Sequence, residues 1–79
     1  MLTRYLSAAL HRATYKVLHD GSFFGEIPGF DGVWANAGSL ESCREELEEV
    51  LEEWLLFRVS RQLPLPAVGN LELRIREVA

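Results

Sequence analysis

Two histidines are the residues of this 79-residue chain best suited to proton transfer, and Asp20 is the only carboxylate directly beside either of them. His11 and His19 lie eight residues apart. A general base needs a nucleophile or an orienting carboxylate within hydrogen-bonding reach, and this spacing matches no recognised catalytic pair. We therefore expect both histidines to lie on the surface, and we expect the chain not to be an enzyme.

Cys43 is the single cysteine, so an internal disulfide cannot form. No cysteine or histidine pair has the spacing of a zinc site. The position of Cys43 among apolar residues favours a small buried side chain over a reactive thiol. The composition predicts a cytoplasmic protein without metal or cofactor. It also predicts no membrane association, because no apolar run approaches the ~20 residues that cross a bilayer.

The charged residues argue for a basic partner or for none, and against nucleic acid. The net charge is −4, and an acidic surface repels phosphate backbones, so we expect no direct contact with nucleic acid. Seven glutamates fall within one short stretch: Glu41, Glu45, Glu46, Glu48, Glu49, Glu52 and Glu53. They are most simply the solvated face of a helix, and the alternative is an acidic dock for a basic partner. Both interpretations can hold together.

The length of the chain predicts a single domain over residues 1–79, since a chain this short forms one core. Residues 1–12 hold a short amphipathic helix, and residues 13–79 form the remaining core. Alternating residues over 13–19, 22–27 and 33–36 predict three strands. Asp20-Gly21 marks a hairpin turn between the first two, and Pro28 ends the second because proline donates nothing to a ladder.

A long helix is predicted over residues 39–62, where the apolar period changes to 3.6 and Ser39 supplies a good N-cap. The prolines of Leu63-Pro64-Leu65-Pro66 end it. Alternation over residues 71–76 predicts a last strand. The fold class is therefore α+β, with two layers: an antiparallel sheet in the order β-β-β-α-β, covered on one face by the long helix.

The stretch from Gly21 to Cys43 resembles the HicB antitoxin family. The family pattern combines an aromatic and a small residue in a hairpin strand, a hydrophobic residue followed by proline, a loop ending in glycine, and a capped helix start. The matching positions are, in that order, Phe23 or Phe24, Gly25, Ile27-Pro28, Gly32 and Ser39-Leu40-Glu41. With the Glu- and Leu-rich helix and the Leu-Pro-Leu-Pro turn that follow, the resemblance covers about residues 13–79.

The resemblance implies a partly degraded ribonuclease-H-like fold that neutralises a small basic toxin, HicA, which cleaves messenger RNA. Ribonuclease-H chemistry requires several carboxylates converging on two metal ions. The predicted strands and turns offer only scattered ones: Glu26, Glu72, Glu77, Asp20 and Asp31. We therefore expect no metal-dependent hydrolysis. The family's C-terminal DNA-binding segment has no counterpart in this sequence, so DNA binding is not part of the expectation.

Large aromatic residues beside turns are the expected anchors for a HicA-type toxin, because aromatics are frequent hot spots of interfaces. These anchors are Phe24, Phe30 and Trp34, although core filling is an equally good interpretation of Phe30 and Trp34. Three glutamates of the long helix, Glu48, Glu49 and Glu52, are expected to steer a basic partner.

Self-association is expected as well, with a symmetric dimer as the default. Small domains without disulfides or metals often gain stability this way, and the apolar stripe of the long helix is wider than one sheet face should cover. The expected interface residues are Leu2, Tyr5, Leu6, Leu55, Leu56 and Val59. The alternative to an antitoxin is thus a stand-alone structural or regulatory domain that assembles with itself.

Overall fold

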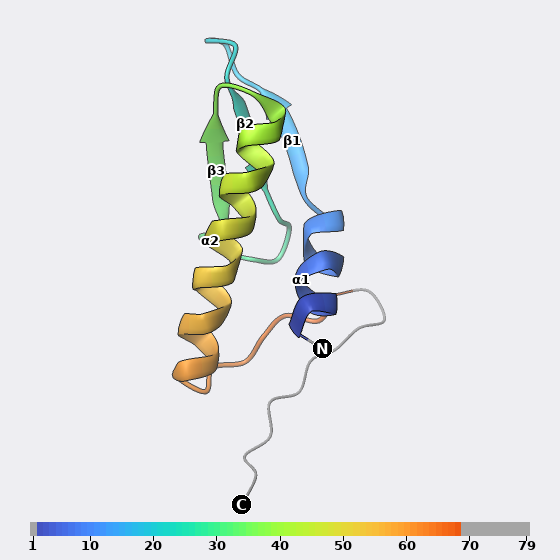
Figure 1. Ribbon diagram of the computed structural model, residues 1–79, viewed down its shortest axis with the longest axis vertical. Helices are drawn as coiled ribbons and strands as arrows, with labels where there is room; N and C mark the ends of the chain where they lie inside the picture. Colours follow the sequence, from blue (N-terminus) through green and yellow to red (C-terminus); the bar gives the residue numbers. More distant parts are fainter. Residues whose placement is uncertain (1, 69–79) are drawn as a thin grey trace, which may run out of the picture.

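The computed structural model describes residues 2–68 and has a short helix, a three-stranded antiparallel sheet and a long helix (Figure 1). The elements are α1 (Leu2–His11), β1 (Thr14–Val17), β2 (Phe23–Glu26), β3 (Trp34–Ala37) and α2 (Leu40–Ser60). The predicted α+β fold, with its helix at residues 2–11 and its long helix, is confirmed. The strand predicted over residues 71–76 lies outside the described residues.

A short loop joins β1 to β2. The Leu18 amide donates to the Ser22 carbonyl oxygen at 2.8 Å, and the Gly21 amide donates to the Leu18 carbonyl oxygen at 2.9 Å. Gly21 has a φ of +86°, the left-handed conformation that such a loop requires of its last residue. The Asp20 carboxylate accepts from the amide and the hydroxyl of Ser22, and these bonds lower the pKa of Asp20. The loop length fixes the register of the hairpin.

That register divides the sheet into an inner face, which α2 covers, and an outer face. Gly25 pairs with Tyr15 on β1 and with Ala35 on β3, and these three residues lie on the inner face. Phe24 and Trp34 precede Gly25 and Ala35 and therefore lie on the outer face, because successive side chains of a strand alternate. Within residues 2–68, no element covers that outer face (Figure 1).

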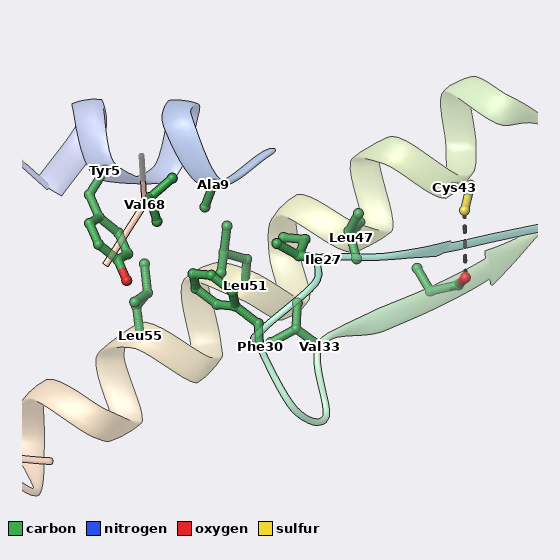
Figure 2. Packing of buried hydrophobic residues seen from close by; sticks show 11 residues of the cluster. Tyr5, Ala9, Ile27, Phe30, Val33, Cys43, Leu47, Leu51, Leu55 and Val68 are labelled. Carbon is green, nitrogen blue, oxygen red and sulfur yellow. Dashed lines mark hydrogen bonds between the residues drawn. The ribbon is translucent and has the colours of Figure 1, made fainter. Parts of the chain in front are cut away.

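The long helix begins at the predicted cap, where the Ser39 hydroxyl accepts from the Ser42 amide at 3.1 Å. It then buries one side chain every four residues, on the side that faces the sheet and α1: Cys43, Leu47, Leu51 and Leu55. Figure 2 shows Leu47, Leu51 and Leu55 among side chains from α1 and from the loop between β2 and β3, and Cys43 hydrogen-bonded to the Ala35 carbonyl oxygen of β3. The remaining buried residues are Tyr5, Ala9, Ile27, Phe30, Val33, Ala35 and Val68.

The chain after α2 turns back and packs against both helices, as the prolines predict. The Arg58 Nε donates to the Pro64 carbonyl oxygen at 2.9 Å, and the Tyr5 hydroxyl donates to the Pro66 carbonyl oxygen. Val68 is buried between the side chains of Tyr5 and Ala9 (Figure 2). Two side-chain hydrogen bonds and the apolar packing of Leu65 and Val68 therefore hold residues 64–68 in place.

Gly25 generates the first prediction, because a Cβ at this position would lie 2.7 Å from Tyr15 Cε1 and 3.1 Å from Cys43 Sγ. Overpacking of this kind typically costs ~1–3 kcal/mol. Gly25→Ala should therefore lower the free energy of unfolding by about that amount, as measured by urea denaturation. Gly38→Ala is the matched control, since no heavy atom lies within 4 Å of its added Cβ. Equal stabilities of the two variants would contradict the close packing at Gly25.

The two tyrosines give a second prediction, on stability at alkaline pH. Burial raises the pKa of Tyr5 and of Tyr15. A raised folded-state pKa means that the folded protein favours the neutral phenol. This preference adds to the free energy of unfolding below pH ~10, the pKa of tyrosine in the unfolded chain. The contribution is lost as the pH rises through the pKa of the tyrosine in the folded protein. The free energy of unfolding should therefore fall as the pH is raised above ~10.

Two Phe substitutions separate the contributions of these tyrosines. Tyr5→Phe removes the hydrogen bond to Pro66 and should cost ~1 kcal/mol at pH 7. Tyr15→Phe should cost little there, because the buried Tyr15 hydroxyl has no hydrogen-bond partner among the described residues. Each variant should show a weaker loss of stability above pH ~10. Variants as pH-sensitive as the parent would show that neither phenol causes the loss.

Candidate protein-binding surface

The outer face of the sheet carries an aromatic pair in which Trp34 is exposed and Phe24 is half-buried. Phe24 of β2 and Trp34 of β3 stack with ring centroids 5.9 Å apart and an interplanar angle of 24°. Trp34 is 55% exposed. The two residues are diagonal neighbours in the register, since Glu26 pairs with Trp34 and Phe24 pairs with Asn36, and aromatic side chains reach that distance. Each ring therefore restricts the motion of the other on a rigid strand.

Polar groups surround this pair. Lys16 Nζ lies 5.4 Å from the centroid of the Phe24 ring, within the range of a cation–π contact. Asn36 Nδ2 donates to the Phe23 carbonyl oxygen at 2.8 Å and to the Ser22 hydroxyl at 3.0 Å. The exposed Glu26 lies directly opposite Trp34. Exposed aromatics with a polar border are typical of surfaces that bind proteins.

Lys16 was not among the predicted site residues, although the sequence contains the signal for it. The loop at Asp20-Gly21 pairs Val17 with Phe23 and Lys16 with Phe24. The hairpin register that this loop sets therefore places Lys16 beside the aromatic pair.

The prediction that Phe30 anchors a partner is wrong, because this side chain is only 3% exposed. Its ring packs between Tyr5, at a centroid distance of 6.3 Å, and Trp54, at 5.2 Å. The loop turns it inward through two short turns, closed by the hydrogen bonds that the amides of Phe30 and Val33 donate. Core filling is therefore the correct interpretation of Phe30.

The three predicted steering residues, Glu48, Glu49 and Glu52, are exposed on the side of α2 that faces away from the sheet. With Ser42, Glu45 and Glu46 they line an open hollow on the helix. Because α2 covers the inner face of the sheet, this acidic surface and the Phe24–Trp34 pair lie on opposite faces of the domain. The structure thus does not bring the predicted anchors and the predicted steering residues together.

The predicted oligomer interface is also partly wrong. Tyr5 and Leu55 are 0% and 1% exposed, because the apolar stripes of α1 and α2 face each other and the returning chain. Neither residue is available to a second molecule. The other predicted interface residues differ in exposure: Leu6 and Val59 are half-buried, Leu56 is 62% exposed, and the side chain of Leu2 lies outside the described part of the chain.

Phe57 was not predicted as a surface residue, yet it is 52% exposed. The Arg61 guanidinium carbon lies 5.0 Å from the centroid of its ring. Phe57 lies at the margin of the apolar stripe of α2. This position predicts an exposed side chain, since residues at such margins only partly face the core.

The groups that could carry chemistry lie apart from one another. His11 and His19 are exposed. Cys43 is fully buried, its Sγ donates to the Ala35 carbonyl oxygen at 3.5 Å, and burial, together with the Glu46 carboxylate, raises the pKa of its thiol. The prediction of a buried core cysteine is confirmed. Among residues 2–68, no three His, Cys, Asp or Glu side chains gather closely enough to hold a metal ion.

The helices of this described region also include none that is long and apolar enough to span a bilayer. On the sheet, the aromatic side chain of Trp34 is 55% exposed and stacks on Phe24.

Comparison with known proteins agrees with this fold. No curated protein matches the chain. Among solved structures, the chain is similar to TTHA0281 from Thermus thermophilus, with 42% sequence identity and a TM-score of 0.90, covering 96% of this chain and 95% of that one. A family model described as UPF0150-like matches residues 4–66, a range that includes β1, β2 and β3 and nearly all of α1 and α2. The chain therefore belongs to the UPF0150-like family.

Proposed function

We propose that this chain is an antitoxin-like, protein-binding module that neutralises a small basic toxin of the HicA type. The observation that carries the proposal is the stacked Phe24–Trp34 pair on the uncovered face of the sheet, in which Trp34 is 55% exposed. The resemblance of residues 21–43 to HicB antitoxins supports it, because both aromatics fall within that stretch.

The outer sheet face suits this role because its aromatic side chains are already ordered. Binding costs free energy for every side chain that must be immobilised. Phe24 and Trp34 stack on each other between two hydrogen-bonded strands, so little ordering remains to be done. Lys16 and Glu26 border the rings with charges of opposite sign, which favour a partner with a complementary polar rim.

The acidic face of α2 acts differently in this proposal. A partner seated on the sheet does not touch Glu48, Glu49 or Glu52, which lie across the domain. Their charges, within a net charge of −4, attract a basic toxin before contact. They therefore influence the association rate, while the desolvated aromatic contact sets the dissociation rate.

Trp34→Ala tests the anchor. If a HicA-type toxin binds the outer sheet face, the variant should lose ~2 kcal/mol of affinity or more, mainly through a dissociation rate ~30-fold faster. Surface plasmon resonance measures both rates, and circular dichroism verifies the fold. Leu40→Ala is the control, because Leu40 is 48% exposed but lies at the start of α2. A folded Trp34→Ala variant with an unchanged dissociation rate would refute this site.

Charge reversal tests the steering role. The double variant Glu48→Lys/Glu49→Lys should slow association at low ionic strength and leave the dissociation rate unchanged, because it alters only long-range attraction. The difference from the parent should shrink as salt is added. A change confined to the dissociation rate would place the toxin on α2 instead. If no such toxin binds, the self-assembling structural or regulatory domain becomes the better proposal.

A further inference from the structure

The C-terminal half of α2 runs past the end of the sheet, as Figure 1 shows. It exposes two large apolar side chains next to each other, Leu56 at 62% and Phe57 at 52%, and Leu63 beyond the helix is 37% exposed. The sheet does not reach this part of the helix, and the residues returning after α2 pack on its other side. Among the described residues this surface is therefore uncovered, and it carries exposed apolar side chains.

Three exposed residues on this surface follow one another at intervals of four: Glu53, Phe57 and Arg61. Residues four apart lie on the same side of a helix. Arg61 is the C-cap residue of α2, and its guanidinium carbon lies 5.0 Å from the Phe57 ring centroid. The Arg61 side chain therefore lies on the same side of the helix as Phe57. We call these three residues the acid–aromatic–cation stripe.

We infer that the acid–aromatic–cation stripe is the docking surface for a second copy of this chain. Two α2 helices would cross antiparallel about a twofold axis at Phe57. That axis places the two Phe57 rings against each other and puts Glu53 of each copy opposite Arg61 of the other, since both lie four residues from the centre. Such a contact is isologous and closes as a dimer.

The charges of the stripe indicate that its binding partner is a second copy of this chain. Glu53 and Arg61 are eight residues apart, which is ~12 Å along a helix, so they cannot pair within one chain. A surface with an acid and a base at equal distances on either side of an aromatic is complementary to an antiparallel copy of itself. A parallel copy would oppose like charges, which costs free energy.

A charge swap tests this dimer. Sedimentation equilibrium of the full chain at tens of micromolar should give twice the monomer mass of 9.0 kDa. Glu53→Arg alone and Arg61→Glu alone should each weaken the dimer at least ~10-fold, because each creates two like-charge contacts across the axis. The double variant Glu53→Arg/Arg61→Glu should recover most of the affinity. It also controls for the loss of Arg61 at the helix end.

Phe57→Ser tests the apolar centre and should give a folded monomer, with Leu40→Ser as the control at the other end of α2. A parent chain that stays at 9.0 kDa, a double variant as weak as the single ones, or a dimer that survives Phe57→Ser would overturn the inference. The outcome is independent of the proposed function, because a monomeric Phe57→Ser variant retains the Phe24–Trp34 face for toxin binding.

Discussion

The close contact between α2 and the middle strand is the constraint on which the rest of the structure depends. At Gly25 no side chain separates the strand from the helix, so the Tyr15 ring and the Cys43 sulfur share that space. This contact fixes which side of β2 faces inward. Phe24 must then face solvent, because a slip by one residue would move every side chain of the strand to the other face. The outer aromatic pair is thus a consequence of the packing beneath it.

Local sequence signals were sufficient for most of the fold. The Ser39 cap, the apolar period of α2 and the Asp20-Gly21 loop each determine structure within a few residues, and the elements lie where those signals predict them. Burial was harder to predict. Periodicity identifies the apolar side of an element but not what that side contacts. Periodicity therefore leaves Phe30 open to the core and to an interface, and it places Leu55 at an interface. The packing of α1 and the returning chain puts both side chains in the core.

The candidate site was predictable in part of its residues but not in its geometry. Phe24 and Trp34 were identified because they are large aromatics near turns, and the acidic residues of α2 because they are concentrated in one stretch. Their separation follows from the two-layer architecture. A strand side chain on the outer face of the sheet and a helix side chain on the solvent side of α2 point in opposite directions. The Phe24–Trp34 pair and the acidic residues of α2, which the sequence predicts as one partner-binding set, therefore lie on two different surfaces.

This separation has a consequence for valency. A contact at the end of α2 leaves the outer sheet face uncovered, so an assembly of two copies would present two Phe24–Trp34 pairs on separate subunits. A partner with two matching sites, or a paired partner, would bind the second pair as an intramolecular event at a raised effective concentration. A weak contact at each small aromatic pair could then give a long-lived complex, and its lifetime would depend on protein concentration through the α2 contact.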